Sequence, residues 1–157
     1  MASARSGKTE GAVGTRNRNP KILILATLSG GYRGADAVGQ SHLEYAPDTY
    51  ILPVRSAAIF PEDFYLHAFE RGIDGIIVMY SGTDSPYKGE SERTAQIINN
   101  AYPRMKVRGL DPRRLRLAAI CTVCVNPFLK EIQRMNALLD EIGLVPHPLP
   151  LADAVQV

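Results

Sequence analysis

Two cysteines separated by two residues are the sharpest chemical signal in this sequence. Cys121 and Cys124 belong to the run CTVC, which directly follows an apolar segment and shortly precedes Pro127. Two thiols at this spacing can form a redox-active disulfide or supply two ligands to a metal ion. Buried cysteine also packs well as a small hydrophobic side chain. A redox or shared metal site and a purely structural role therefore both stay open for this pair.

A glycine-rich stretch is the second candidate. Thr27–Asp36 reads TLSGGYRGAD, and it follows the apolar run KILIL. Glycine lets the backbone turn sharply and approach a ligand closely. The Gly30–Gly34 loop could cradle a phosphate, with Arg33 and Arg55 as partners of the anion. The stretch lacks the G-x-G-x-x-G spacing of a dinucleotide site.

Acidic and histidine side chains offer weaker signals. Asp36 and Asp84 could form a carboxylate pair, or they could cap the first helix and make a turn, respectively. We expect His42 and His67 to lie within helices and His147 between prolines. None of the three belongs to a set with the spacing of metal ligands.

The elements that would position these residues alternate regularly. Apolar runs predict four strands, at Lys21–Thr27, Tyr50–Val54, Gly75–Tyr80 and Leu115–Ile120. Helical patterns follow each of them, after Gly34, at Pro61–Gly72, at Glu90–Tyr102 and at Pro127–Ile142. The alternation predicts an α/β fold: a three-layer, parallel, four-stranded sheet of the flavodoxin-like or Rossmann-like type. Gly75–Tyr80 should be central, and Tyr50–Val54 peripheral because Pro53 lacks a donor.

Four loops should then meet at the carboxyl edge of the sheet, where ligands bind in such folds. They are Thr27–Asp36, Arg55–Phe60, Tyr80–Gly89 and Cys121–Asn126. The most basic stretch, Arg104–Arg116, should lie at the opposite edge. It is either a solvated face or a docking site for an acidic partner.

Composition sets the limits of the function. The 157 residues predict a basic, disordered N-terminal arm at 1–20, one domain at 21–143 and an extended C-terminal strap at 144–157. The arm carries a net charge of +3 and the remainder −1. We therefore expect no nucleic-acid binding. No apolar run is long enough to cross a bilayer and no signal peptide is visible, which predicts a cytoplasmic protein without membrane insertion.

Several segments together resemble one family. GYRGAD, following an apolar strand, is similar to the GYAGAD segment of the methyl-viologen-reducing hydrogenase delta subunit family. Further similarity covers Leu43–Ala57 (LEYAPDTYILPVRSA), Ala68–Met79 (AFERGIDGIIVM) and Leu110–Leu117 (LDPRRLRL). The resemblance extends over roughly Lys21–Gly143.

The resemblance implies a small component of a flavin and iron–sulfur complex of the hydrogenase or heterodisulfide reductase type. Such components hold a [2Fe-2S] cluster that passes electrons between the catalytic and flavin subunits. The family's five cysteine positions fall here on Thr27, Gly30, Arg55, Tyr80 and Ser85. Because thiolates hold iron–sulfur clusters, the resemblance implies a degenerate site with no cofactor in this chain.

We therefore expect a non-catalytic accessory subunit that docks to flavin and iron–sulfur subunits. One alternative is an active electron-transfer subunit in which Cys121 and Cys124 act as a dithiol or share a [2Fe-2S] cluster or another metal with a second chain. The other alternative is a small-ligand or phosphate-binding module at the Gly30–Gly34 loop.

Overall fold

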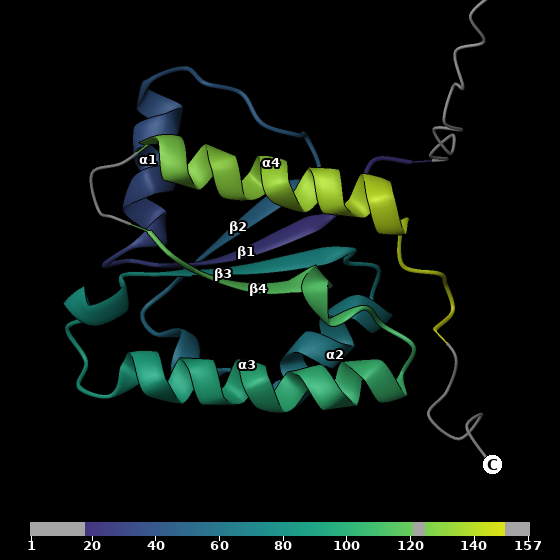
Figure 1. Cartoon of the computed structure of the whole chain (residues 1–157). Helices are drawn as coiled ribbons and strands as arrows, with labels where there is room; N and C mark the ends of the chain where they lie inside the picture. Colours follow the sequence, from purple (N-terminus) through teal and green to yellow (C-terminus); the bar gives the residue numbers. More distant parts are fainter. Residues whose placement is uncertain (1–17, 121–124, 150–157) are drawn as a thin grey trace, which may run out of the picture.

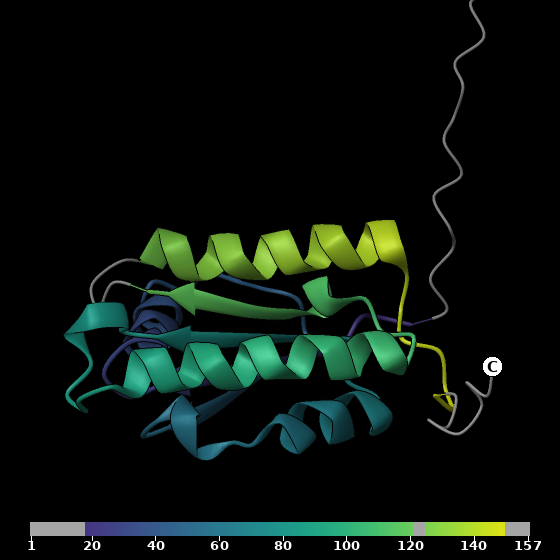
Figure 2. The same ribbon diagram turned by 60° about the horizontal axis from the view of Figure 1, so that its bottom comes forward.

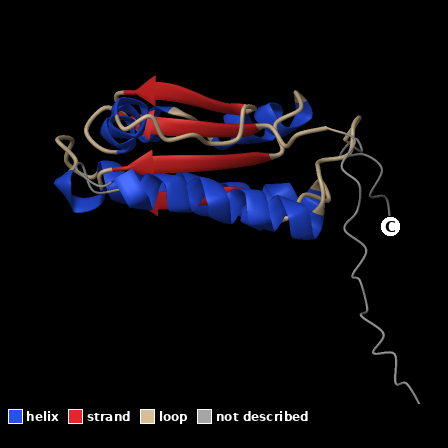
Figure 3. Cartoon of the chain, turned by 90° about the horizontal axis from the view of Figure 1, so that it is seen from above, coloured by secondary structure: helices blue, strands red, loops and turns tan. Residues whose placement is uncertain are grey.

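The computed structural model describes residues 18–120 and 125–149, which form one parallel sheet covered by helices (Figure 1). The four strands are β1 (Ile22–Thr27), β2 (Thr49–Val54), β3 (Gly75–Tyr80) and β4 (Leu115–Ala119). They lie in the order β2-β1-β3-β4, and all pairings are parallel. Figure 3 shows the strand arrows pointing the same way. The predicted α/β fold is confirmed, including the peripheral β2 and the central β3.

Helices cover both faces of the sheet (Figures 1 and 2). One face carries α1 (Gly31–Gln40) and α4 (Val125–Ile142). The other carries α2 (Glu62–Glu70) and α3 (Glu90–Val107). Short 3-10 turns complete the chain, namely η1 (Ala57–Ile59), η2 (Gly82–Asp84) and η3 (Pro112–Arg114).

Two apolar clusters hold the layers together. Because successive strand residues point to opposite faces, β1 and β3 contribute to both clusters. Phe69, Ile76 and Met105 lie in the cluster beneath α2 and α3. Ile77 and Phe128 lie in the cluster beneath α1 and α4. Both helix layers therefore pack on one continuous sheet, which fixes the ends of the strands relative to one another.

The first helix begins earlier than the sequence predicts. It starts at Gly31 rather than after Gly34, so most of the glycine-rich stretch is helical. The interpretation of Asp36 as its cap is wrong, since Asp36 lies inside α1 and accepts a hydrogen bond from Gln40 at 2.8 Å. His42 lies after the helix, with φ 53°, whereas His67 lies within α2 as expected.

The third helix continues beyond its predicted end at Tyr102. Pro103 lies inside α3, and the helix ends only at Val107. Proline removes one backbone donor and crowds the carbonyl of the preceding turn. Both Pro103 and Asn99, whose carbonyl is affected, are exposed, so water can satisfy that carbonyl. The helix is therefore not forced to end there.

Asp74 closes the amino edge of the sheet. Its fully buried carboxylate accepts hydrogen bonds from Arg18 at 2.5 and 3.0 Å, and from the backbone N–H groups of Lys21 and Val145. The backbone carbonyl of Asp74 accepts a hydrogen bond from Arg114. One carboxylate thus ties the segments before β1 and after α4 to the start of β3.

Parts of the predicted domain plan lie outside the described residues. These are 1–17 of the predicted arm and 150–157 of the predicted strap, so both predictions stay predictions. Leu144–Leu149 forms neither helix nor strand, and Val145 is buried. Within 18–120 and 125–149, no helix is both long and apolar enough to cross a membrane.

Candidate functional site at the carboxyl edge

The strand order reverses between β1 and β3, and the loops that follow these strands face each other there. The chain leaves β1 toward β2 on one side, whereas β3 continues to β4 on the other. In open α/β sheets this crevice is the usual ligand-binding position. The loops after β1 and β3, which carry candidate residues from the sequence, therefore border this crevice.

In this chain the crevice is occupied by close backbone contact. A Cβ atom at Gly30 would lie 2.6 Å from the Ser81 nitrogen and 2.7 Å from the Tyr80 carbonyl carbon. A Cβ atom at Gly31 would overlap the Cβ atom of Met79. These separations are shorter than van der Waals contact, so only glycine lets the loop after β1 rest on the end of β3. The glycines serve close packing between the two strand ends.

Hydrogen bonds fasten the neighbouring loops to this contact. The hydroxyl groups of Ser29 and Ser81 lie 3.1 Å apart. The N–H of Leu28 donates to the carbonyl of Val54 at 2.9 Å, which joins the ends of β1 and β2. The N–H of Ile120 donates to the carbonyl of Tyr80 at 2.8 Å. The three described loops of the four predicted at this edge do converge.

The five positions that the sequence resemblance matches to family cysteines carry no thiol. Thr27 is buried, and its hydroxyl finds no hydrogen-bond partner in the described part of the chain. Arg55 is exposed and Tyr80 half-buried. Ser85 donates a hydrogen bond to Glu90. Hydroxyls, a guanidinium, a phenol and a glycine do not replace thiolates, so these residues do not fit a cysteine-ligated cluster.

The packing around Gly30 leaves no room for a cysteine side chain. A cysteine there would need its Cβ atom where the backbone of Tyr80 and Ser81 already lies. The loop would have to move away from β3 before a thiolate could point into the crevice. The packing around Gly30 and the side chains at the other four positions therefore both argue against a cysteine-ligated cluster.

The two cysteines, Cys121 and Cys124, lie outside the described residues. The chain enters their segment at Ile120, beside Tyr80. Among residues 18–120 and 125–149, no three His, Cys, Asp or Glu side chains gather as metal ligands would.

Asp84 lies in η2, as its interpretation as a turn residue predicts, and Asp36 pairs with Gln40 within α1.

A cavity beside the crevice brings together residues that the sequence analysis did not group. It measures about 480 Å³ and lies between the turn after β2 and the start of α3. Three basic residues line it, namely Arg55, Lys88 and Arg93. Only Arg55 was a candidate from the sequence, and Arg33, its expected partner, does not line this cavity. Lys88 and Arg93 carry no motif, and only the fold places them beside Arg55.

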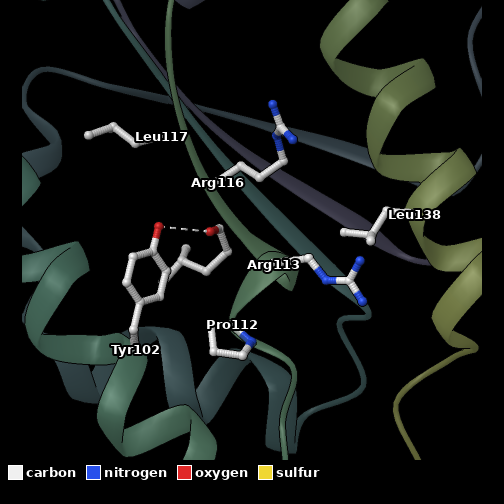
Figure 4. Close-up of a pocket in the computed structure, with 7 residues that line it drawn as sticks. Tyr102, Pro112, Arg113, Arg116, Leu117 and Leu138 are labelled. Carbon is white, nitrogen blue, oxygen red and sulfur yellow. Dashed lines mark hydrogen bonds between the residues drawn. The ribbon is translucent and has the colours of Figure 1, made fainter.

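The basic stretch at the opposite edge is largely neutralised within the chain. Arg104 pairs with Asp63, and Arg108 pairs with Glu70. Arg113 contacts Asp111 and Glu141, Arg116 contacts Glu131, and the guanidinium of Arg114 donates to two backbone carbonyls. An open groove of about 460 Å³ runs between this stretch and α4 (Figure 4). Tyr102 lies beside it and donates a hydrogen bond to the Leu115 carbonyl.

Comparison with known proteins connects this fold and site to one family. The model of the family described as "Methyl-viologen-reducing hydrogenase, delta subunit" matches residues 22–143. An iron-sulfur subunit of the F420-non-reducing hydrogenase vhu of Methanocaldococcus jannaschii is 21% identical, with 83% of this chain and 97% of the relative aligned. An iron-sulfur subunit of the F420-non-reducing hydrogenase of Archaeoglobus profundus is 24% identical over 79% of this chain and 91% of the relative.

A third relative is much longer. It is one of the subunits of the ferredoxin/F(420)H(2)-dependent CoB-CoM heterodisulfide reductase of Methanosarcina acetivorans, and it is 25% identical over 84% of this chain. The match spans only 17% of that protein. The same kind of domain thus occurs both as a separate chain and within a larger one. Since the family model covers most of the sequence, this chain belongs to the methyl-viologen-reducing hydrogenase delta subunit family.

Proposed function

We propose that this chain is an accessory subunit of a multi-subunit flavin and iron–sulfur oxidoreductase of the hydrogenase or heterodisulfide reductase type. Its role in the complex is to dock other subunits rather than to catalyse a reaction. Relatives that align over more than nine-tenths of their own length are named as iron–sulfur subunits of hydrogenases, and a longer one is named as part of a heterodisulfide reductase.

We further propose that the family's [2Fe-2S] site has been lost. One observation carries this proposal: position 30, which the sequence resemblance matches to a cysteine of the family, holds a glycine whose Cβ would lie 2.6 Å from the Ser81 backbone. The residues at the other four positions supply no thiolate. The edge that would hold a cluster is instead a packed junction between the loops after β1 and β3.

Affinity purification of the full chain from its native cells, under anaerobic conditions, tests the docking role. Co-purification in defined stoichiometry with a flavoprotein or a hydrogenase-like subunit is the expected result. A stable monomer that elutes without such a partner would contradict the accessory role.

A second candidate function is electron transfer through Cys121 and Cys124. It is supported by the hydrogen bond from Ile120 to Tyr80, because the residue before Cys121 is thereby held beside a position that the resemblance matches to a family cysteine. Two thiolates could then complete a metal site with ligands from another chain. A visible absorption spectrum of the purified complex that disappears in Cys121→Ser would favour this function over the first.

A further inference from the structure

Three cations surround one cavity at the carboxyl edge. Arg55, Lys88 and Arg93 all line it, and all three are exposed. Within residues 18–120 and 125–149, none of them forms an ion pair with a carboxylate. The arginines near the opposite edge, by contrast, mostly contact Asp or Glu side chains. Positive charge at this cavity is therefore available to another molecule.

Apolar side chains lie beside these cations. Ile59 and Tyr87 line the same cavity and are 69% and 47% exposed. Exposed tyrosine and arginine side chains in one patch are typical of protein interfaces, where such residues supply much of the binding energy. The patch therefore offers apolar contact as well as charge.

The cavity continues along α3 as a groove. Ile59 and Arg93 also line a second cavity of about 320 Å³, which reaches Gln96 and Asn100 further along the helix. Glu62 also lines this second cavity, and its carboxylate accepts a hydrogen bond from Asn100. A groove that follows more than two turns of a helix suits an extended polypeptide better than a compact ion. The start of α3 and the carboxyl ends of the strands lie at the same end of the molecule (Figure 2).

A buried carboxylate argues against a small free anion in this cavity. Glu90 lines it, is only 5% exposed and accepts a hydrogen bond from Ser85. A phosphate deep in the cavity would approach this carboxylate. Acidic side chains that contact the exposed cations Arg55, Lys88 and Arg93 without entering the cavity avoid this repulsion.

We propose that this groove binds an acidic segment of a partner polypeptide. Carboxylates of the segment contact Arg55, Lys88 and Arg93, and an apolar side chain packs on Ile59 and Tyr87. The proposal rests on the proposed function, because it assigns a surface to the docking that function requires.

Zero-length carbodiimide cross-linking of the purified complex tests the proposal. This reagent joins a lysine amine to a carboxylate that contacts it, and peptide mass spectrometry locates the link. Lys88 should link to an Asp or Glu of the partner, and Lys88→Arg should abolish the link while the complex persists. Lys106, an exposed lysine at the far end of α3, should not link to that segment.

Charge reversal gives a second measurement. The double variant Arg55→Glu/Arg93→Glu should weaken the complex about tenfold or more, because attraction becomes repulsion. Arg71→Glu/Lys106→Glu changes the net charge equally at exposed positions near the other end of the molecule and should leave affinity within about twofold. A complex that forms without a Lys88 link and tolerates the first double variant overturns the proposal but not the proposed function.

The free chain provides the test if no complex is found, an outcome that counts against the proposed function. A short synthetic peptide of glutamates and leucines is titrated against the chain by calorimetry, with inorganic pyrophosphate as the competing probe. Peptide binding that Arg55→Glu/Arg93→Glu removes supports the groove as a peptide site. Binding of pyrophosphate alone, or of neither probe, overturns it.

Discussion

Adding one methyl group at Gly30 should destabilise this fold severely. In Gly30→Ala the new Cβ atom would lie within 3 Å of three backbone atoms of Tyr80 and Ser81. Backbone atoms at the end of a central strand cannot rotate away as a side chain can. Overpacking in a well-packed core typically costs about 1–3 kcal/mol, and we expect about 3 kcal/mol or more for this backbone clash.

Two other glycines give a graded comparison. In Gly75→Ala the nearest atoms belong to the flexible side chain of Met135, at 2.6 and 2.9 Å, so a cost of about 1–2 kcal/mol is expected. In Gly39→Ala the Cβ atom meets nothing within 4 Å inside α1, and alanine should stabilise the helix by about 0.5–1 kcal/mol.

Urea unfolding followed by circular dichroism measures these differences as changes in the free energy of unfolding. The expected order of stability is Gly39→Ala, then the natural chain, then Gly75→Ala, then Gly30→Ala. A cost below about 1 kcal/mol for Gly30→Ala would refute the reasoning. It would mean that the loop after β1 can leave β3 and open space for a bound group.

Three further predictions concern Asp74 and Tyr65. Burial alone raises the pKa of Asp74, but hydrogen bonds from Arg18 and from the backbone of Lys21 and Val145 bring this pKa below its ordinary value. The stability that the ionised Asp74 carboxylate contributes should therefore be complete above about pH 4 and be lost as the pH falls through the lowered pKa. Unfolding measured across that range should show the loss in the natural chain, and a flat profile there would contradict it. Asp74→Asn should cost about 2 kcal/mol of unfolding free energy in urea at neutral pH, a cost limited because Arg18 is partly exposed. The variant should lose less stability in acid than the natural chain, because asparagine does not titrate. An unchanged urea midpoint would contradict the role given to this carboxylate. The Tyr65 hydroxyl is buried without a hydrogen-bond partner in the described part of the chain, and burial raises its pKa; Tyr65→Phe should be neutral or stabilise by up to about 1 kcal/mol, and a clear loss of stability would show that the hydroxyl has a partner.

The positions of most strands and of two helix ends can be predicted from short stretches of sequence. The runs at Ile22–Thr27 and Gly75–Tyr80 are apolar almost without interruption, as strands buried on both faces are. Gly72 and Gly143 end their helices with φ of 104° and 78°, a conformation that favours glycine. Pro53 lies on the edge strand, where a missing donor costs little.

The sequence was less informative where a residue acts through distant neighbours. Gly31 and Gly34 suggested a loop, because glycine usually weakens a helix. In the fold they lie inside α1 and allow contact with Met79 and Phe128, which are far away in the chain. The helical conformation of this stretch depends on that packing. The spacing of apolar residues in the sequence gives no information about it.

The charges of the candidate site show the same limit. Arg104 and Arg108 look like a free basic patch until α2 places Asp63 and Glu70 beside them. Lys88 and Arg93 look like ordinary surface residues until the fold places them around the same cavity as Arg55. Which cations are free to bind a partner is a property of tertiary structure.

The most direct test of the central claim is the iron and acid-labile sulfide content of the chain. The purified chain and its Cys121→Ser/Cys124→Ser variant are incubated anaerobically with iron and sulfide, desalted, and examined by visible absorption. The proposed loss of the family site predicts that the variant retains neither iron nor sulfide and shows no cluster absorption. A stable [2Fe-2S] spectrum in this variant would contradict it, because the cluster would then be held without either cysteine.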